Sequence, residues 1–261
     1  MAAVHMTLPG PREHLPAMRP LAGPTVQLFL TSFTLLFVEL ILIRWIPSLV
    51  TYVGFFSNFL LMASFLGIGL GILLGRHGGR LAASPFPVLL LATMTLVTST
   101  QLNVQVRSTG EIFFGLAENQ SADVNFLVLP LVVLLVVALM ATLALPLGPL
   151  LRSMAPLRAY AVDISGSMAG IAAFALVSLA ATPPGVWFSV VAVLLLLLAL
   201  GRGPTIWSAV GGVAMAAVVF GGFLNPTNLT QVWSPYYRID IFPDNHGTEH
   251  LSVNGIPHQA M

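Results

Sequence analysis

Three ionisable residues, Glu39, Arg44 and Asp163, stand inside stretches of sequence that are otherwise apolar. A charged side chain in the hydrocarbon of a bilayer costs about 3 kcal/mol or more to insert, so such residues mark binding or proton-transfer sites, or else fix helix packing. Glu39 is the deepest of the three. It is the candidate for a protonated carboxyl or for an interhelical hydrogen bond, and both interpretations stay open.

Arg44 follows Glu39 by five residues, so the two do not share a helix face as i, i+4 partners would. Asp163 lies near the start of its own apolar stretch, at the opposite end from Arg44, and we predict that these two do not pair either. Arg44 is expected to reach outward, with Trp45 as an interfacial anchor. Asp163 is expected in a polar inner mouth near Arg158.

The histidines His246, His250 and His258 cluster near the C-terminal end of the sequence, which contains no cysteine. A metal site needs three or four converging ligands. We therefore predict solvated loop histidines and no metal site. The sequence also lacks a Gly-rich phosphate loop after a strand and any Ser/His/Asp context, so no catalytic residue is predicted.

The composition predicts which environment must position these residues. Hydrophobic residues make up 57% of the 261 residues and charged residues only 7%, whereas a soluble domain has about a quarter charged residues. The net charge of +1, without a Lys/Arg run, excludes nucleic-acid binding. The sequence predicts an all-α polytopic bundle in a lipid bilayer, between a flexible segment 1–24 and a C-terminal tail 225–261.

Seven stretches within residues 25–224 approach the roughly 20 apolar residues that a membrane span needs. They are Val26–Ile46, Phe55–Leu74, Phe86–Val104, Val124–Leu147, Tyr160–Ala181, Gly185–Leu200 and Ile206–Leu224. The third is diluted by hydroxyl side chains and the sixth is short, so either could be a re-entrant segment. Gly67, Gly71 and Gly75 lie four apart in the second stretch, which favours close helix packing over a substrate path.

Arginines set the predicted orientation. Positive charge precedes the first stretch and follows the second, fourth and sixth, at Arg12, Arg19, Arg76, Arg80, Arg152, Arg158 and Arg202. This pattern predicts a multi-pass protein of the cell (inner) membrane with a cytoplasmic N-terminus. Seven full spans would then put the tail outside, and one re-entrant segment would return it to the inside.

The tail has strand rather than helix periodicity. Tyr237, Ile239 and Ile241 alternate with Arg238 and Asp240, which predicts a strand with one apolar face. Residues 244–247 predict a turn, and a second alternating run leads to a turn signal at residues 254–255. We predict a β-hairpin that begins a further strand.

Three segments together resemble the membrane-bound spermidine synthase-like proteins, relatives of the polyamine aminopropyltransferases. They are Phe37-Val38-Glu39-Leu40 through Arg44 with the glycines of residues 67–71, then Tyr160-Ala161-Val162-Asp163-Ile164-Ser165-Gly166-Ser167 with Gly170, then Trp233-Ser234-Pro235-Tyr236-Tyr237-Arg238-Ile239 with Leu251-Ser252-Val253-Asn254-Gly255. In that family a Rossmann-like domain follows the hairpin. It binds decarboxylated S-adenosylmethionine and transfers the aminopropyl group to putrescine. That domain is not in this sequence, so we expect no catalysis by this chain alone and a separate catalytic half as its partner.

The resemblance also implies two positions for substrate binding. Tyr237 stands where the soluble enzymes place a nucleoside-contacting glutamine, and Gln259 comes one residue later than their usual glutamine. Two other functions stay open beside the aminopropyltransferase: a transporter of small solutes or polyamines, suggested by Glu39, Asp163 and the Gly-rich stretch, and a membrane scaffold. A homo-oligomer is an alternative to the separate catalytic half.

Overall fold

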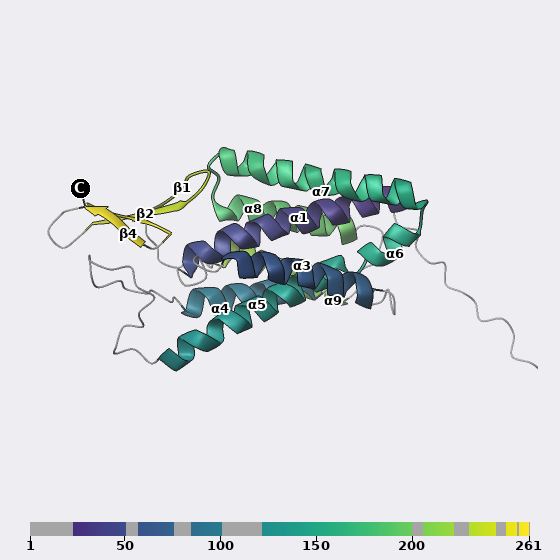
Figure 1. Ribbon diagram of the computed structural model, residues 1–261. Coiled ribbons are helices and arrows are strands. Elements are labelled where there is room, and N and C mark those ends of the chain that lie inside the picture. Colours follow the sequence, from purple (N-terminus) through teal and green to yellow (C-terminus); the bar gives the residue numbers. More distant parts are fainter. Residues whose placement is uncertain are drawn as a thin grey trace, which may run out of the picture.

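The computed structural model describes residues 23–50, 57–75, 85–100, 122–199, 206–221, 230–243, 249–254 and 256–260. These residues form a mostly helical bundle with a small antiparallel sheet at one end (Figure 1). The helices are α1 (Pro24–Leu49), α3 (Ser57–Leu74), α4 (Phe86–Thr100), α5 (Ala122–Ala144), α6 (Leu147–Arg152), α7 (Pro156–Leu179), α8 (Pro184–Ala199) and α9 (Ile206–Phe220). The segment 1–22, most of the lead-in predicted to be flexible, lies outside the described residues.

Helix α1 is the element around which the bundle is built, since α3, α5, α6, α7 and α8 all pack against it. It begins at Pro24, whose fixed φ and missing N–H suit the first position of a helix. Apolar residues fill most of its length, and Leu28, Phe37, Ile41 and Trp45 are fully buried. Because side chains are buried on several sides of α1, it is an interior helix and not an amphipathic surface helix.

Glycines let two pairs of helices approach closely. A Cβ added to Gly67 of α3 would come within 2.5 Å of the Val137 carbonyl oxygen of α5, and Gly71 and Gly75 meet α5 and the turn after it in the same way. On α7, a Cβ on Gly166 would lie 2.5 Å from the Phe29 carbonyl oxygen of α1. Small residues at four-residue spacing bring membrane helices together in this manner, so the predicted packing role of the Gly67 series is confirmed.

The glycine contacts also give the directions of the helices. Gly166 meets Phe29 and Gly170 meets Phe33, so α1 and α7 are parallel. Helix α3 ends beside α6, where Gly148 faces the Ile72 carbonyl, and α6 leads directly into the start of α7. Helix α3 therefore runs opposite to α1. The sheet lies at the end of the bundle where α1 and α7 finish (Figure 1), away from the start of α1.

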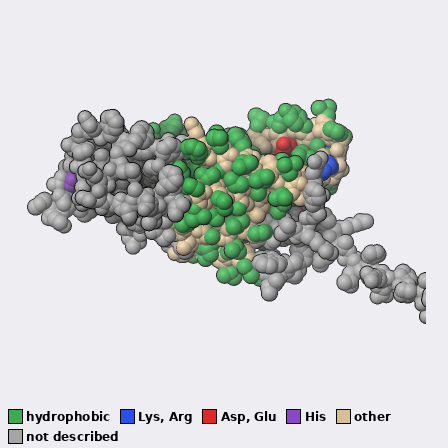
Figure 2. Space-filling model, turned by 60° about the horizontal axis from the view of Figure 1, so that its bottom comes forward, with side chains coloured by type: hydrophobic (Ala, Val, Ile, Leu, Met, Phe, Trp, Pro, Cys, Tyr) green, Lys and Arg blue, Asp and Glu red, His purple; other side chains and the backbone are tan. Residues whose placement is uncertain are grey.

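Three helical segments in the described part are long and apolar enough to cross a membrane: Pro24–Leu49, Leu129–Arg152 and Pro156–Leu179. The remaining helices α3, α4, α8 and α9 are apolar but shorter. Large apolar side chains are exposed along the bundle, including Met62, Phe65, Leu134, Met168 and Leu196. Figure 2 shows apolar side chains covering the middle of the bundle on the face drawn. Such a surface suits lipid contact better than water.

The tail forms a four-stranded antiparallel sheet in the order β1-β2-β3-β4. Its strands are β1 (Thr230–Trp233), β2 (Arg238–Pro243), β3 (Glu249–Val253) and β4 (Ile256–Ala260). The predicted hairpin and the further strand that it begins correspond to β2, β3 and β4. The sequence did not predict β1, because that strand is too short to produce an alternating pattern. Asn254 has φ 50°, as a tight turn between β3 and β4 requires. The turn predicted at 244–247 lies outside the described residues.

Candidate functional site

Arg44 ties α1 to α7 and to the sheet. Its Nη1 donates a hydrogen bond to Ser178 Oγ of α7, and its Nη2 donates one to the backbone carbonyl of Ser234, which follows β1. Ser178 Oγ donates in turn to the Pro235 carbonyl at 2.9 Å. Arg44 therefore does not simply extend outward as predicted. It fixes the β1–β2 connection to the ends of two helices, and the planar guanidinium suits two acceptors at once.

Aromatic rings enclose this arginine. The Arg44 guanidinium carbon lies 4.7 Å from the centroid of the Trp187 ring and 5.7 Å from that of Trp233. The two tryptophans pack edge to face with centroids 5.0 Å apart, a favourable arrangement of ring quadrupoles. Trp187 comes from α8 and Trp233 from β1, so a third helix joins the junction. Cation–π contacts of this kind strengthen when water is excluded.

Trp45 does not lie at a membrane surface as predicted. Its side chain is 0% exposed and packs edge to face against Phe188 of α8, with ring centroids 5.7 Å apart. The prediction relied on the usual position of tryptophan at membrane interfaces. The sheet covers this end of α1 instead, so Trp45 belongs to the protein interior.

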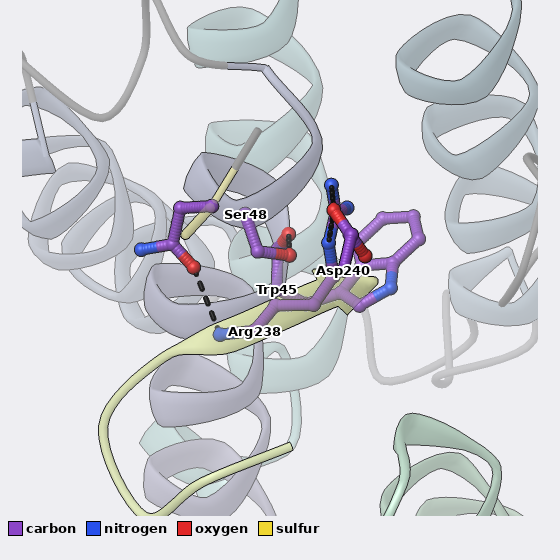
Figure 3. A network of polar contacts seen from close by, with 5 residues as sticks. Trp45, Ser48, Arg238 and Asp240 are labelled. Atoms are coloured by element: carbon purple, nitrogen blue, oxygen red, sulfur yellow. Dashed lines mark hydrogen bonds and ion pairs between the residues drawn. The ribbon is translucent and has the colours of Figure 1, made fainter. Parts of the chain in front are cut away.

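A buried ion pair lies on the face of the sheet turned toward α1. Arg238 and Asp240, both on β2, are 5% and 2% exposed, and Arg238 Nη2 lies 2.7 Å from Asp240 Oδ2. Figure 3 shows the pair beside Trp45 and Ser48 of α1. The predicted strand is present as β2, and its polar positions are the buried ones. The polar positions of β2 point inward, while Tyr237 is 54% exposed and Ile239 and Ile241 are half-buried.

Several polar atoms of this junction are buried without a hydrogen bond to a described residue. They are Arg44 Nε, Trp45 Nε1, Arg238 Nη1 and Asp240 Oδ1. A buried polar atom without a partner lowers the stability of the folded state. The remaining hydrogen bonds and aromatic contacts of the junction must therefore offset the cost of these four atoms. We name this cluster of Arg44, Trp45, Trp187, Trp233, Arg238 and Asp240 the bundle–sheet junction.

Asp163 lies at the other end of the bundle, and Arg44 does not pair with it. Its Oδ1 accepts a hydrogen bond from Ser32 Oγ of α1 at 2.5 Å. It also lines an open hollow of about 600 Å³, together with Leu151, Arg152, Met154, Pro156, Ala159 and Tyr160. The predicted neighbour Arg158 instead donates to Thr25 Oγ1 at 3.4 Å. Asp163 thus lies at an open hollow, but most of the residues that line it are apolar and Arg158 is not among them, so the expected polar mouth stays a prediction.

Glu39 lies on α1 between these two sites. Its side chain is 2% exposed, and neither carboxylate oxygen accepts a hydrogen bond from any residue that the structure describes. Of the two predicted alternatives for Glu39, the interhelical hydrogen bond is therefore not formed with any described residue. Of the three intramembrane candidates, Arg44 and Asp163 are hydrogen-bonded to other helices and Glu39 is not.

The two positions implied for substrate binding, Tyr237 and Gln259, lie at different strands of the sheet, and β3 stands between these strands. Tyr237 precedes β2, and its backbone N–H and carbonyl are used by Ser234 to close the β1–β2 connection. Gln259 is on β4, opposite Leu251 of β3. Binding roles for both remain predictions. Among the described residues no group of three His, Cys, Asp or Glu side chains could hold a metal, and His246 lies outside that part.

Sequence reasoning did not identify Trp187, Trp233, Arg238 or Asp240 as site residues. A usable signal existed in β2, where Arg238 and Asp240 stand two apart and therefore share one face of the strand. Opposite charges at that spacing can neutralise each other. The polar face of the strand can then pack against the bundle, where an apolar face would usually be expected. Trp187 and Trp233 carry no local signal, because only the folded chain brings them to Arg44.

Comparisons of the chain with protein-family models, with curated proteins and with solved structures found no match.

Proposed function

We propose that the chain is a polytopic membrane protein in which α1, α3, α4, α5, α7, α8 and α9 each cross the bilayer. The support is the alternation of helix directions, with α1 and α7 parallel and α3 opposite to them, together with the apolar exposed surface of the bundle. Helices α4 and α9 have 15 residues and α8 has 16, which gives about 22–24 Å at 1.5 Å per residue. Local thinning of the bilayer accommodates spans of that length.

The proposed orientation has the N-terminus in the cytoplasm of a cell with an inner membrane. Arg152 and Arg158 lie at the bundle end where α1 begins, because Arg158 bonds to Thr25 and α6 adjoins the end of α3. Positive charge favours the cytoplasmic side. The sheet then faces outward. Reporter fusions after Met261, one active only outside the cytoplasm and one fluorescent only inside, test this orientation, and fluorescence from the second would contradict it.

For the function itself we propose a membrane-embedded platform on which the sheet carries a partner catalytic domain of the spermidine synthase-like type. One observation supports this most strongly: Arg44 bonds both to Ser178 of the bundle and to the carbonyl of Ser234 beside the sheet. A sheet fixed in this way holds whatever it binds at a set distance from the membrane. The resemblance of the segments 233–239 and 251–255 to that family's hairpin module supplies the identity of the partner.

Aminopropyl transfer is the activity that the resemblance implies for the assembled protein. In that reaction carboxylates of the catalytic domain would position the cationic diamine, and a base would accept its proton. The donor, decarboxylated S-adenosylmethionine, is a cytoplasmic metabolite, so this activity requires the sheet on the cytoplasmic side. The arginines favour the reverse orientation. Aminopropyl transfer is therefore the alternative to the orientation proposed above, and the two proposals exclude each other. The reporter fusions therefore test the aminopropyltransferase proposal as well, and an external sheet would exclude it.

The platform proposal is tested by adding a spermidine synthase-like catalytic domain, as a separate chain, to the purified full-length protein in detergent. We expect the domain to co-elute with the protein and to transfer aminopropyl groups from decarboxylated S-adenosylmethionine to putrescine. The matched control is Arg44→Gln, which keeps a donor but loses the second bond and the cation. Weaker association with this variant would support the role of the junction. Failure of the catalytic domain to co-elute with the folded wild-type protein would refute the platform proposal.

A second candidate, a transporter of small solutes or polyamines, is favoured by the buried Glu39 carboxyl, which accepts no hydrogen bond from a described residue. The glycines no longer support it, because Gly67, Gly71 and Gly75 are occupied by packing against α5 and its C-terminal turn. Liposomes containing only this chain test the proposal with radiolabelled putrescine. Uptake that Glu39→Gln abolishes would support transport, and the absence of uptake above protein-free liposomes would exclude it.

A further inference from the structure

Glu39 lies in apolar surroundings halfway along α1. Leu35 and Leu42, one turn before and one turn after it, are fully buried. The Glu39 side chain is 2% exposed, and both of its oxygens lack a hydrogen bond from a described residue. The ionised form of a carboxyl is strongly disfavoured in such a place unless a cation or several donors stabilise it.

No described charged group on the elements that pack against α1 hydrogen-bonds to Glu39. Among the described residues of α3, α4 and α8 there is no charged residue at all, and the side chain of Asp123 on α5 is outside the described part. Helices α6 and α7 bring Arg152, Arg158, Tyr160 and Asp163, and the described titratable side chains of the strands are Arg238, Asp240 and His250.

The charged groups among these are bound elsewhere. Arg152 donates to the Gly148 carbonyl and Arg158 to Thr25, while Arg238 and Asp240 pair with each other. On α1 itself, Arg44 is bound to Ser178 and to the Ser234 carbonyl. The described residues therefore offer Glu39 no counter-ion, and the remaining way to neutralise the carboxyl is a proton.

On the Glu39 face of α1, Ser32 leads to a carboxylate of α7, Asp163. Ser32, which donates to Asp163, precedes Glu39 by seven residues, so the two side chains lie on nearly the same face of α1 and about 10 Å apart along its axis. Asp163 also lines the open hollow between α6 and α7. A carboxylate that is open to solvent and lies on the same face is well placed to exchange protons with a buried one.

From this geometry we propose that Glu39 is a proton-binding site inside the bundle, loaded and unloaded through the end that carries Ser32 and Asp163. One proton adds to a Glu39 carboxylate oxygen to give the neutral acid, and the same proton leaves to water at the hollow. The proposal rests on neither of the two functions above, since a bound proton needs neither a catalytic domain nor solute transport.

Infrared difference spectroscopy on the full-length protein in liposomes tests the proposal directly. The wild-type minus Glu39→Gln spectrum at neutral pH is expected to contain the carbonyl stretch of a protonated carboxylic acid, shifted in heavy water. The matched control Asp163→Asn should keep this band and shift it more slowly after transfer to heavy water. A Glu39 signal with only carboxylate stretches would overturn the protonation, and an unchanged shift rate would overturn the entry route.

Two further measurements distinguish loss of the protonated carboxyl from loss of the folded structure. Dicyclohexylcarbodiimide, which attacks protonated carboxyls in apolar surroundings, should give an adduct that peptide mass spectrometry assigns to Glu39. A folded protein labelled only elsewhere would contradict the proposal. Glu39→Gln should also melt at the wild-type temperature, because the amide replaces a neutral acid of the same shape. A clear loss of thermal stability would mean that the native carboxyl was ionised and paired.

Discussion

At the seam between α3 and α5, glycines let one helix backbone lie directly on another, whereas at the bundle–sheet junction charged and aromatic side chains fill the space. The glycine contacts described there are to backbone and small apolar atoms: a Cβ on Gly71 would meet the Ala141 carbonyl and the Ala144 Cβ. The junction buries Arg238 and Asp240 and half-buries Arg44, and four of its polar atoms lack a described partner. The seam should therefore be sensitive to volume and the junction to charge.

The largest effect should come from breaking the buried ion pair. Asp240→Leu leaves Arg238 charged and buried without a counter-ion, which costs about 3–5 kcal/mol in comparable pairs. We expect the free energy of unfolding in detergent, followed by tryptophan fluorescence, to fall by that amount. The control is the double substitution Arg238→Met/Asp240→Leu, which removes both charges and should recover most of the loss. A single variant as stable as the wild type would mean that the pair is not buried.

Arg44→Lys should have the next largest effect. Lysine keeps the charge but cannot reach Ser178 Oγ and the Ser234 carbonyl together or stack on Trp187. Loss of a hydrogen bond to a charged group costs about 1.5–3 kcal/mol. Thermal melting of this variant should be compared with that of Arg158→Lys, an exposed position where we expect no change. Equal melting temperatures for the two variants would show that Arg44 does not fix the sheet.

Gly71→Ala tests the seam, and Gly69→Ala is its matched control on the same helix. A Cβ on Gly71 would collide with the Ala141 carbonyl oxygen, whereas a Cβ on Gly69 meets nothing within 4 Å. Overpacking costs about 1–3 kcal/mol, while alanine in an open helical position gains up to about 1 kcal/mol over glycine. The two variants should therefore shift the midpoint of unfolding in opposite directions. A shift of the same sign in both would argue against backbone contact between α3 and α5.

The smallest effect is expected in the turn between α7 and α8. Ala181 has φ 52°, a left-handed conformation that costs a residue with a Cβ about 1–2 kcal/mol. Ala181→Gly removes this strain but adds freedom to the unfolded chain. The net gain should be about 1 kcal/mol or less, measured as a higher melting temperature. A lower melting temperature would indicate that the turn adopts another conformation.

The α3–α5 seam and the bundle–sheet junction also differ in how well the sequence predicts them. Helix positions followed from apolar length, and the seam followed from glycine spacing, because both signals are local and recur in membrane helices. Asp163 was placed correctly at the opposite end from Arg44 by helix direction alone. The junction was not predictable in this way. Burial of Trp45 depends on the sheet covering the end of α1, and the inward face of Arg238 depends on Asp240 neutralising it.

The central claim is that the sheet is a fixed part of the bundle, and a distance measurement tests it most directly. Because the chain has no cysteine, spin labels can be attached to cysteines introduced in pairs at exposed positions. Leu179 and Tyr236 are exposed at the junction end, and Leu157 is exposed at the far end of α7. Leu179 follows Leu157 by 22 positions (179 − 157), which is a rise of about 33 Å along the helix.

Pulsed electron resonance on the 179/236 pair should give a short, narrow distance distribution, and the 157/236 pair should give a much longer and equally narrow one. Both would follow from a sheet held by Arg44, Trp187 and Trp233 at the end of α7. Broad, overlapping distributions for the two pairs in a folded bundle would contradict the account, because they would mean that the sheet moves independently of the helices.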